Sequence, residues 1–145
     1  MDSRISKNFT WSEFTHSDTA KAHHINNAIT DWDVRDNAIA LFANVVQPAR
    51  DVYGEAVYIT SGFRCKELNE LVGGVDDSQH QYGEATDVTC SDLHRLAEII
   101  IELKLPFDQM GINNTYLHIS HKREGENRGQ IFYYANYKGK RDLKL

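Results

Sequence analysis

The chain has 145 residues, of which 41% are hydrophobic and 26% charged, and this composition predicts a globular protein long enough to bury one core. Its formal net charge of -5 argues against a nucleic-acid partner, which usually requires a basic face. No apolar run approaches the roughly 20 residues that cross a bilayer, so we expect no membrane partner. The length also predicts a single domain over residues 1–145. The first residues lack the apolar segment of a secretory signal, so we expect synthesis in the cytoplasm.

The N-terminal third predicts a short helix followed by a long one. Two aromatic residues stand three apart in the segment WSEF, at helical spacing, and Thr10 or Ser12 is suited to cap this turn. Over residues 33–53 apolar side chains recur every three or four positions, which predicts an amphipathic helix. Pro48 lies near the end of this helix and predicts a kink or a break there.

Several residues that often bind metals lack suitable partners in the sequence. His16, His23 and His24 lie among polar residues with no carboxylate or cysteine at ligand spacing, so we expect them in a solvated loop. Cys65 and Cys90 are too few for a disulfide framework, and with no third cysteine a sulfur-ligated metal site is not expected. We expect two free thiols, with pairing of the two as the alternative.

The remainder of the chain alternates short strands with helices. The glycine pair at 73 and 74 is suited to close a short helix, and Ser91 is suited to cap a later one. This order predicts an α+β domain, with helices before and between the strands of a small, mainly antiparallel sheet. The expected strands cover residues 56–61, 85–90, 107–112, 116–120 and 130–137, and the expected helices cover residues 65–71 and 92–104.

Two histidines and one aspartate form a candidate metal-ligand set. His80, Asp87 and His118 supply the donor types of a catalytic zinc site that leaves one coordination position open. His80 and Asp87 are seven residues apart, an odd spacing that on a continuous strand would direct them to opposite faces. We therefore expect the chain to turn at Gly83. Spacing alone is not specific here, because seven histidines give many chance pairs.

Four segments in order carry a more specific signal: SGFR, VGG shortly after Asn69, SQHQYGEATD and YLHIS. Together they resemble the zinc D-Ala-D-Ala carboxypeptidase family, which includes small bacterial and phage cell-wall peptidases. The similarity extends from about Ser6 to Phe132. It implies a fold like that of the D,D-peptidases and the hedgehog signalling domain, a Zn²⁺ cofactor, and peptidoglycan peptides as the partner.

The resemblance also assigns roles to individual residues. It implies that His80, Asp87 and His118 bind the zinc ion. Arg64 matches the arginine that holds the carbonyl or carboxylate end of the substrate, a role that suits a planar guanidinium group. A surface ion pair is the alternative for Arg64.

Two serines are candidate substrate-binding residues. Ser78 either borders the substrate cleft or orients His80. Ser120 either supports the substrate or satisfies hydrogen bonds within its own strand. Neither alternative is favoured by the sequence.

One position departs from the family pattern. Better-studied relatives have a carboxylate three residues before the second histidine, where it serves as the general base, and this chain has Thr115 there. Glu84 and Asp108 are the candidate replacements, with His121 as a further candidate acid. Glu84 is alternatively an exposed carboxylate at a strand edge, and Asp108 is alternatively a structural group at the turn after Pro106.

We therefore interpret the chain as a zinc metallopeptidase that hydrolyses peptide bonds in peptidoglycan stem peptides, as a D,D-carboxypeptidase or an endolysin-type endopeptidase. The expected lack of a signal suits a phage-type endolysin that reaches the cell wall by another route. The threonine at position 115 motivates an alternative, a non-catalytic zinc-containing module that binds cell-wall peptides. A third possibility is a structural domain that has lost the metal.

Overall fold

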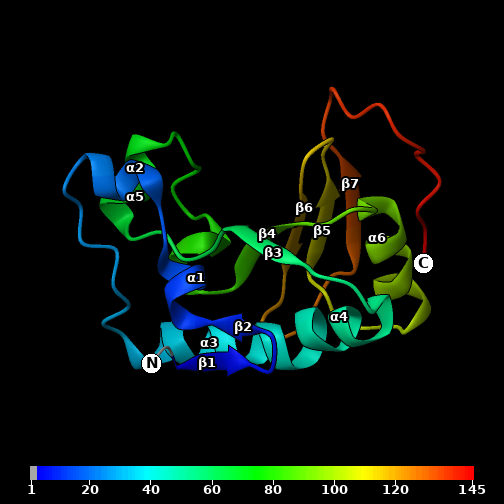
Figure 1. Ribbon diagram of the computed structural model, residues 1–145, viewed down its shortest axis with the longest axis horizontal. Helices are drawn as coiled ribbons and strands as arrows, with labels where there is room; N and C mark the ends of the chain where they lie inside the picture. Colours follow the sequence, from blue (N-terminus) through cyan, green and yellow to red (C-terminus); the bar gives the residue numbers. More distant parts are fainter. Residues whose placement is uncertain (1–2) are drawn as a thin grey trace.

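The structure, a computed structural model, describes residues 3–145 and is organised around a five-stranded sheet with the order β3-β4-β6-β5-β7 (Figure 1). Its neighbouring strands are antiparallel except β5 and β7, which are parallel. Helices lie before and between these strands, so the expected α+β fold with a mainly antiparallel sheet is confirmed. The strands are β3 (Tyr58–Ser61), β4 (Ala85–Thr89), β5 (Gln109–Ile112), β6 (Leu117–Ser120) and β7 (Gln130–Tyr133), and a separate small sheet contains β1 (Arg4–Ser6) and β2 (Phe9–Thr10).

The first helix begins at a reciprocal cap. The Thr10 hydroxyl accepts the Glu13 N–H at 3.2 Å, while the Glu13 carboxylate accepts the Thr10 N–H at 2.9 Å. None of the helices described in residues 3–145 is long and apolar enough to cross a membrane. The helices are α1 (Trp11–Thr15), α2 (Asp18–Ala22), α3 (Trp32–Leu41), α4 (Gln47–Tyr53), α5 (Lys66–Leu71) and α6 (Leu93–Glu102), with a π-helix η1 (Phe42–Val46) and a 3₁₀-helix η2 (Gln79–Tyr82).

The long helix expected over residues 33–53 is present, but its irregularity lies ahead of the proline. The π-helix η1 joins α3 to α4, and Pro48 stands in the first turn of α4. A proline ring collides with the carbonyl four residues earlier, here that of Asn44, and a proline nitrogen donates no hydrogen bond. The widened turn accommodates both effects, so the chain continues as a helix instead of breaking at Pro48.

The start of α6 also differs from the expected one. Asp92 caps the helix by accepting the Arg95 N–H at 3.0 Å. The Ser91 hydroxyl, which was expected to be the cap, instead hydrogen bonds to the Tyr53 hydroxyl at 2.8 Å. The longer carboxylate side chain one residue later replaces the serine as the acceptor for the first turn.

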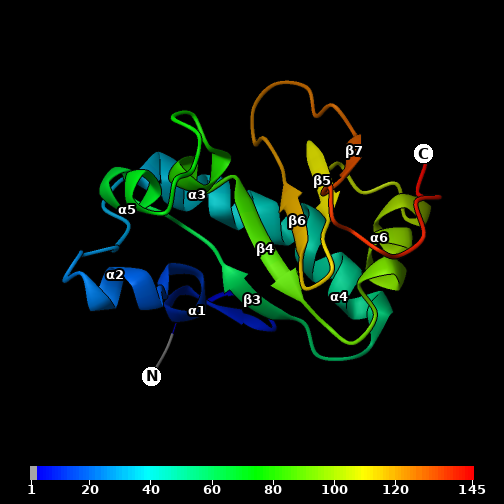
Figure 2. The ribbon, with the colours of Figure 1, turned by 90° about the horizontal axis from the view of Figure 1, so that it is seen from above.

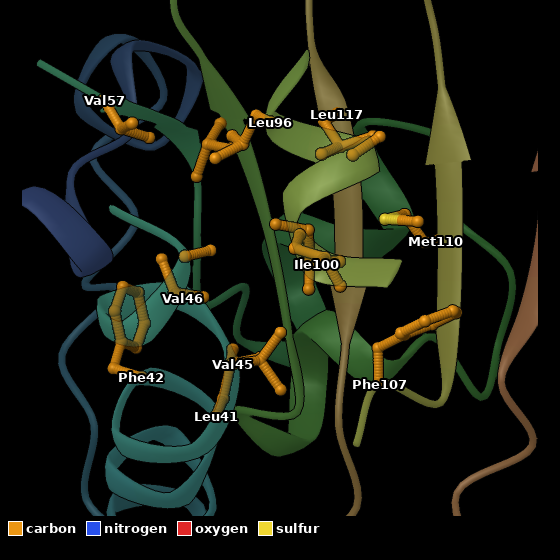
Figure 3. Packing of buried hydrophobic residues seen from close by; sticks show 14 of the residues in the cluster. Leu41, Phe42, Val45, Val46, Val57, Leu96, Ile100, Phe107, Met110 and Leu117 are labelled. Carbon is orange, nitrogen blue, oxygen red and sulfur yellow. The ribbon is translucent and has the colours of Figure 1, made fainter. Parts of the chain in front are cut away.

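One face of the sheet packs against helices, and the other carries the polar candidate residues. In Figure 2 the helices α3 and α4 lie behind the sheet. Figure 3 shows apolar residues of η1 and α6 packed against residues of β5 and β6. Leu117 and Ile119 belong to this core, and side chains alternate along a strand. His118, between them, therefore lies on the face that α3 and α4 do not cover. The hydrophobic core on the covered face includes Leu41, Phe42, Val45, Leu96, Ile100, Met110, Leu117 and Ile119.

Candidate metal centre

The sheet register brings the first two candidate ligands together. Asp87 of β4 is paired with His118 of β6, so both side chains stand on the same face. The Asp87 Oδ1 lies 2.9 Å from the His118 Nδ1. Burial opposes ionisation of Asp87, but the hydrogen bond from His118 and the close approach of His80 outweigh it and hold the pKa of Asp87 well below its ordinary value. The carboxylate is therefore ionised, as a metal ligand requires.

His80 reaches the same point from η2, which is followed by a tight turn at Gly83. That glycine has a φ of +72°, and a Cβ there would lie 2.4 Å from the Val34 carbonyl oxygen, so the turn requires glycine. The His80 Nδ1 donates to the Gly62 carbonyl at 2.7 Å. Since a carbonyl only accepts, the Nε2 is left free to bind a metal ion, and it lies 3.5 Å from the Asp87 Oδ1.

The three residues fit a zinc ion. One ligand atom from each of His80, Asp87 and His118 lies within 4.8 Å of the others, a spacing that a central ion with bonds of about 2 Å can span. Two imidazoles and one carboxylate match the ligand set of catalytic zinc sites. The side chains of His80 and Asp87 are buried and that of His118 is partly exposed, so the site is open on the side of His118.

Arg64 lies next to this ligand set. Its Nη2 is 4.0 Å from the Asp87 Oδ2, and its Nη1 donates to the Asn69 Oδ1 at 3.3 Å. The Arg64 backbone N–H donates to the His80 carbonyl at 3.1 Å, which joins the loop before α5 to η2. The guanidinium is partly exposed, so it is held in place and still accessible to a ligand.

A cleft of about 600 Å³ leads to the open side of the ligand set. His118 and Glu84 both line it, and Val75 and Tyr82 contribute exposed apolar surface. Its volume is within the range of small-molecule and peptide sites. Its remaining lining is polar and includes Asp77, Ser78, Gln79, Gln109, Lys122 and Arg128.

A sequence profile of the family described as peptidase M15 matches residues 7–120, which include every candidate ligand. The chain belongs to the peptidase M15 family. This is the family of zinc D-Ala-D-Ala carboxypeptidases, and membership implies a metallopeptidase. No protein with a curated description matches the chain.

Two serines of this M15 chain are engaged by neighbouring backbone. Ser78 is buried, and its hydroxyl accepts the His80 N–H at 3.3 Å at the start of η2. Ser120 is fully buried, and its hydroxyl accepts the Gln109 N–H at 2.9 Å. These contacts place Ser78 in support of the candidate ligand His80 and Ser120 in support of the pairing between β5 and β6.

The two candidate bases have different surroundings. Asp108 is fully buried, and its oxygens accept from the Arg128 Nε at 2.9 Å, the Arg128 Nη2 at 2.7 Å and the Gln79 Nε2 at 3.0 Å. The Arg128 guanidinium lowers the pKa of Asp108 to about 2. Burial instead raises the pKa of Glu84, which is partly exposed to the cleft. The M15 chain thus lowers the pKa of Asp108, which makes it a weak base, and raises the pKa of Glu84.

The Asp108 ion pair predicts acid sensitivity of the fold. A carboxyl whose folded pKa lies below its unfolded pKa contributes stability that is complete above about pH 4 and lost as the pH falls toward 2. Replacing Asp108 by asparagine should lower the free energy of unfolding by about 1–3 kcal/mol, because an amide cannot accept all of these donors. Urea unfolding at pH 7 and pH 3 checks this, and the variant should lose less stability between the two than the wild type. Equal losses would contradict the assignment.

Thr115 and His121 also have defined positions. Thr115 is exposed, in the turn between β5 and β6. His121 is buried, with its Nδ1 donating to the Pro106 carbonyl at 2.6 Å and its Nε2 3.3 Å from the Asn44 Nδ2. The His121 side chain therefore connects the end of β6 to Pro106 and Asn44, and it does not belong to the candidate ligand set.

Sequence patterns missed two contributors to the site. Asn27 is buried and donates to the Thr15 and Phe63 carbonyls at 2.9 and 2.8 Å, while accepting the Cys65 N–H at 2.8 Å. It fixes the loop that carries Arg64, yet it lies in a polar segment that predicts solvated loop. Gly62 supplies the carbonyl that accepts from His80. Gly62 also lies so close to α1 that a Cβ there would be 2.2 Å from a backbone oxygen. The glycine itself is the only sign of this contact in the sequence.

Proposed function

We propose that the chain is a zinc peptidase that hydrolyses peptide bonds in the stem peptides of peptidoglycan. The observation that supports this most strongly is the convergence of His80, Asp87 and His118 within 4.8 Å at a cleft. Membership of the M15 family supports the class of reaction and the cell-wall substrate. The bond cut is either the terminal D-Ala-D-Ala bond or an internal bond, as in an endolysin-type endopeptidase of phage origin.

The three ligand residues would hold the ion, and two of them, His80 and Asp87, are prepared for that task. The His80 tautomer is set by the Gly62 carbonyl, and the Asp87 carboxylate is kept ionised. A zinc ion bound there would supply a Lewis acid that polarises the scissile carbonyl and lowers the pKa of water. Asp87 and the two imidazoles would keep this centre in one orientation toward the cleft.

Arg64 is proposed to orient the substrate. Its Nη2 lies 4.0 Å from the Asp87 carboxylate, and Asn69 holds its Nη1, so the guanidinium is preorganised beside the ligand set. A planar group with several N–H donors can bind a substrate carboxylate at two points or stabilise the oxyanion that develops on the carbonyl oxygen. Either role places the scissile bond between Arg64 and the open side of His118.

Glu84 is proposed as the general base. It shares the cleft with His118, and burial raises its pKa, the direction of shift that makes a carboxylate a stronger general base. Glu84 precedes Asp87 by three positions, a Cα separation of about 10 Å in extended chain, so we propose that the proton passes through water in the cleft. Glu84 would take the proton of the attacking water and deliver it to the leaving amine. We propose a structural role for Asp108, because Arg128 and Gln79 occupy its oxygens.

Thr115 favours one alternative, a zinc-containing module that binds cell-wall peptides without cleaving them. A threonine at this exposed position cannot accept a proton at neutral pH. In that case the ligand set and Arg64 would still bind a peptide carboxylate or carbonyl, and Glu84 would have no catalytic role.

Digestion of purified peptidoglycan distinguishes the two functions. We expect the zinc-loaded protein to release new amino groups and shortened stem peptides, detected by chromatography and mass spectrometry. Chelation of the metal should stop the release, and added zinc should restore it. Binding of muropeptides without any product, by protein with one zinc per chain, would reject the peptidase and support the binding module.

A further inference from the structure

Strand β7 places an aromatic side chain beside a metal ligand. Gly111 of β5 is paired with His118 of β6 on one side and with Phe132 of β7 on the other. Paired residues in a sheet point to the same face, and the ring centroids of His118 and Phe132 are 6.2 Å apart. Phe132 therefore stands on the same face as the candidate metal centre.

The residue between them must be glycine for this arrangement to exist. A Cβ at Gly111 would lie 2.3 Å from two atoms of the Phe132 ring, well inside van der Waals contact. The ring thus covers β5 at a position where every other residue would place a side chain. This lets Phe132 extend from the edge strand toward His118.

Two tyrosines continue the same surface. The ring of Tyr134 lies 5.4 Å from that of Phe132 and 5.4 Å from that of Tyr116, measured between centroids. The Tyr134 N–H donates to the Ile112 carbonyl at 3.1 Å, which extends the pairing with β5 past the end of β7. We name Tyr116, Phe132 and Tyr134 the aromatic wall.

The aromatic wall is not part of the hydrophobic core. Its three side chains are only partly buried, whereas Ile131 and Tyr133, which alternate with them on β7, pack against the core cluster. Burial and hydrogen bonding to Tyr116 raise the pKa of Tyr134, and the Asp87 carboxylate raises it further. The Tyr134 phenol therefore stays neutral, with its hydroxyl engaged by Tyr116.

Most of the aromatic wall lies outside the part of the chain that matches the M15 family. The match covers residues 7–120, while Phe132 and Tyr134 follow it. The matched part carries the ligands and Arg64. The edge strand adds an apolar surface beside them, and such surfaces contribute to affinity and selectivity at ligand sites.

We propose that the aromatic wall is a binding subsite for a substrate residue with a small apolar side chain, adjacent to the bond that is cut. The proposal rests on the proposed peptidase function. Phe132 would contact the apolar side chain, and the hydroxyl pair of Tyr116 and Tyr134 would offer its remaining O–H to a backbone carbonyl of the same peptide. A methyl group in such a contact changes selectivity by about tenfold or more.

The test compares N-acetylated L-Lys-D-Ala-D-Ala with two analogues, each having glycine in place of one D-alanine. The zinc-loaded wild type should prefer alanine at one of the two positions by about tenfold in kcat/KM. Phe132→Ala should reduce this preference to less than about threefold while zinc stoichiometry is unchanged. Gly111→Ala, which displaces the ring without altering it, should give the same loss. Tyr133→Phe, on the core side of β7, should retain the preference.

The outcomes separate this proposal from the function on which it rests. An unchanged preference in both variants, or loss of zinc from both, would overturn the subsite. If the zinc-loaded wild type cleaves none of the peptides, hydrolysis of this substrate fails, and the same comparison is made by calorimetric titration of the three peptides. An alanine preference in binding that Phe132→Ala and Gly111→Ala remove would support the subsite without catalysis. The subsite would be overturned if the wild type showed no alanine preference in binding, or if the variants kept that preference.

Discussion

Replacing His80 by alanine should abolish zinc binding and peptide hydrolysis together. The change removes one of three ligands and leaves the buried Gly62 carbonyl without its donor. Loss of a hydrogen-bond partner of a ligand alone lowers metal affinity about 10–100-fold, so loss of the ligand itself should lower it by more than 100-fold. Metal analysis after dialysis should give one zinc per wild-type chain and none per variant.

The matched control is His23→Ala, since His23 is an exposed histidine in the N-terminal region and should keep both zinc and activity. Thermal unfolding of each protein in the presence of a chelator shows whether the apo forms are equally folded. A His80→Ala protein that retains stoichiometric zinc would reject the ligand assignment. One that loses zinc but retains full hydrolysis would reject the metal-dependent mechanism.

Replacing Glu84 by glutamine should reduce kcat by about 10²–10⁴-fold, the usual contribution of a general base, with little change in zinc content. Because burial raises the pKa of Glu84 above 4.5, the wild-type rate should fall as the pH drops through that raised value and the carboxylate becomes protonated. The variant should lack this acidic limb. The pH dependence of kcat/KM measures both effects.

Two other carboxylates serve as comparisons. Glu70→Gln alters an exposed residue of α5 and should leave the rate and its pH profile unchanged. Asp108→Asn should lower stability more than it lowers the rate at pH 7, since its carboxylate is bound to Arg128. If Glu84→Gln has the wild-type rate and Asp108→Asn does not, the two roles are reversed.

Local patterns were sufficient to predict much of the architecture. The order of apolar residues shows which face of an element is buried. This was enough to predict the strand around His118 and the helix over residues 33–53. The resemblance carried by SGFR, SQHQYGEATD and YLHIS predicted the family. Gly83 showed where the chain must turn for His80 and Asp87 to meet.

Contacts between distant segments could not be predicted in the same way. Asp108 gave no sign of its partner, because Arg128 lies 20 residues later in a loop with many charges. The site role of Asn27 depends on three backbone groups that only the folded loop brings together. The place of β7 was also hidden, since an aromatic run predicts a strand but does not specify a parallel partner.

The position of β7 at the edge of the sheet has an evolutionary consequence. An edge strand has one neighbour, here β5, so substitutions on its outward face can accumulate without repacking β4 and β6, which hold Asp87 and His118. In the proposed assignment, recognition by β7 and chemistry at Asp87 and His118 lie in different parts of one small sheet. Under that assignment, substitutions in β7 would alter which peptide the site prefers while Asp87 and His118 stayed in place.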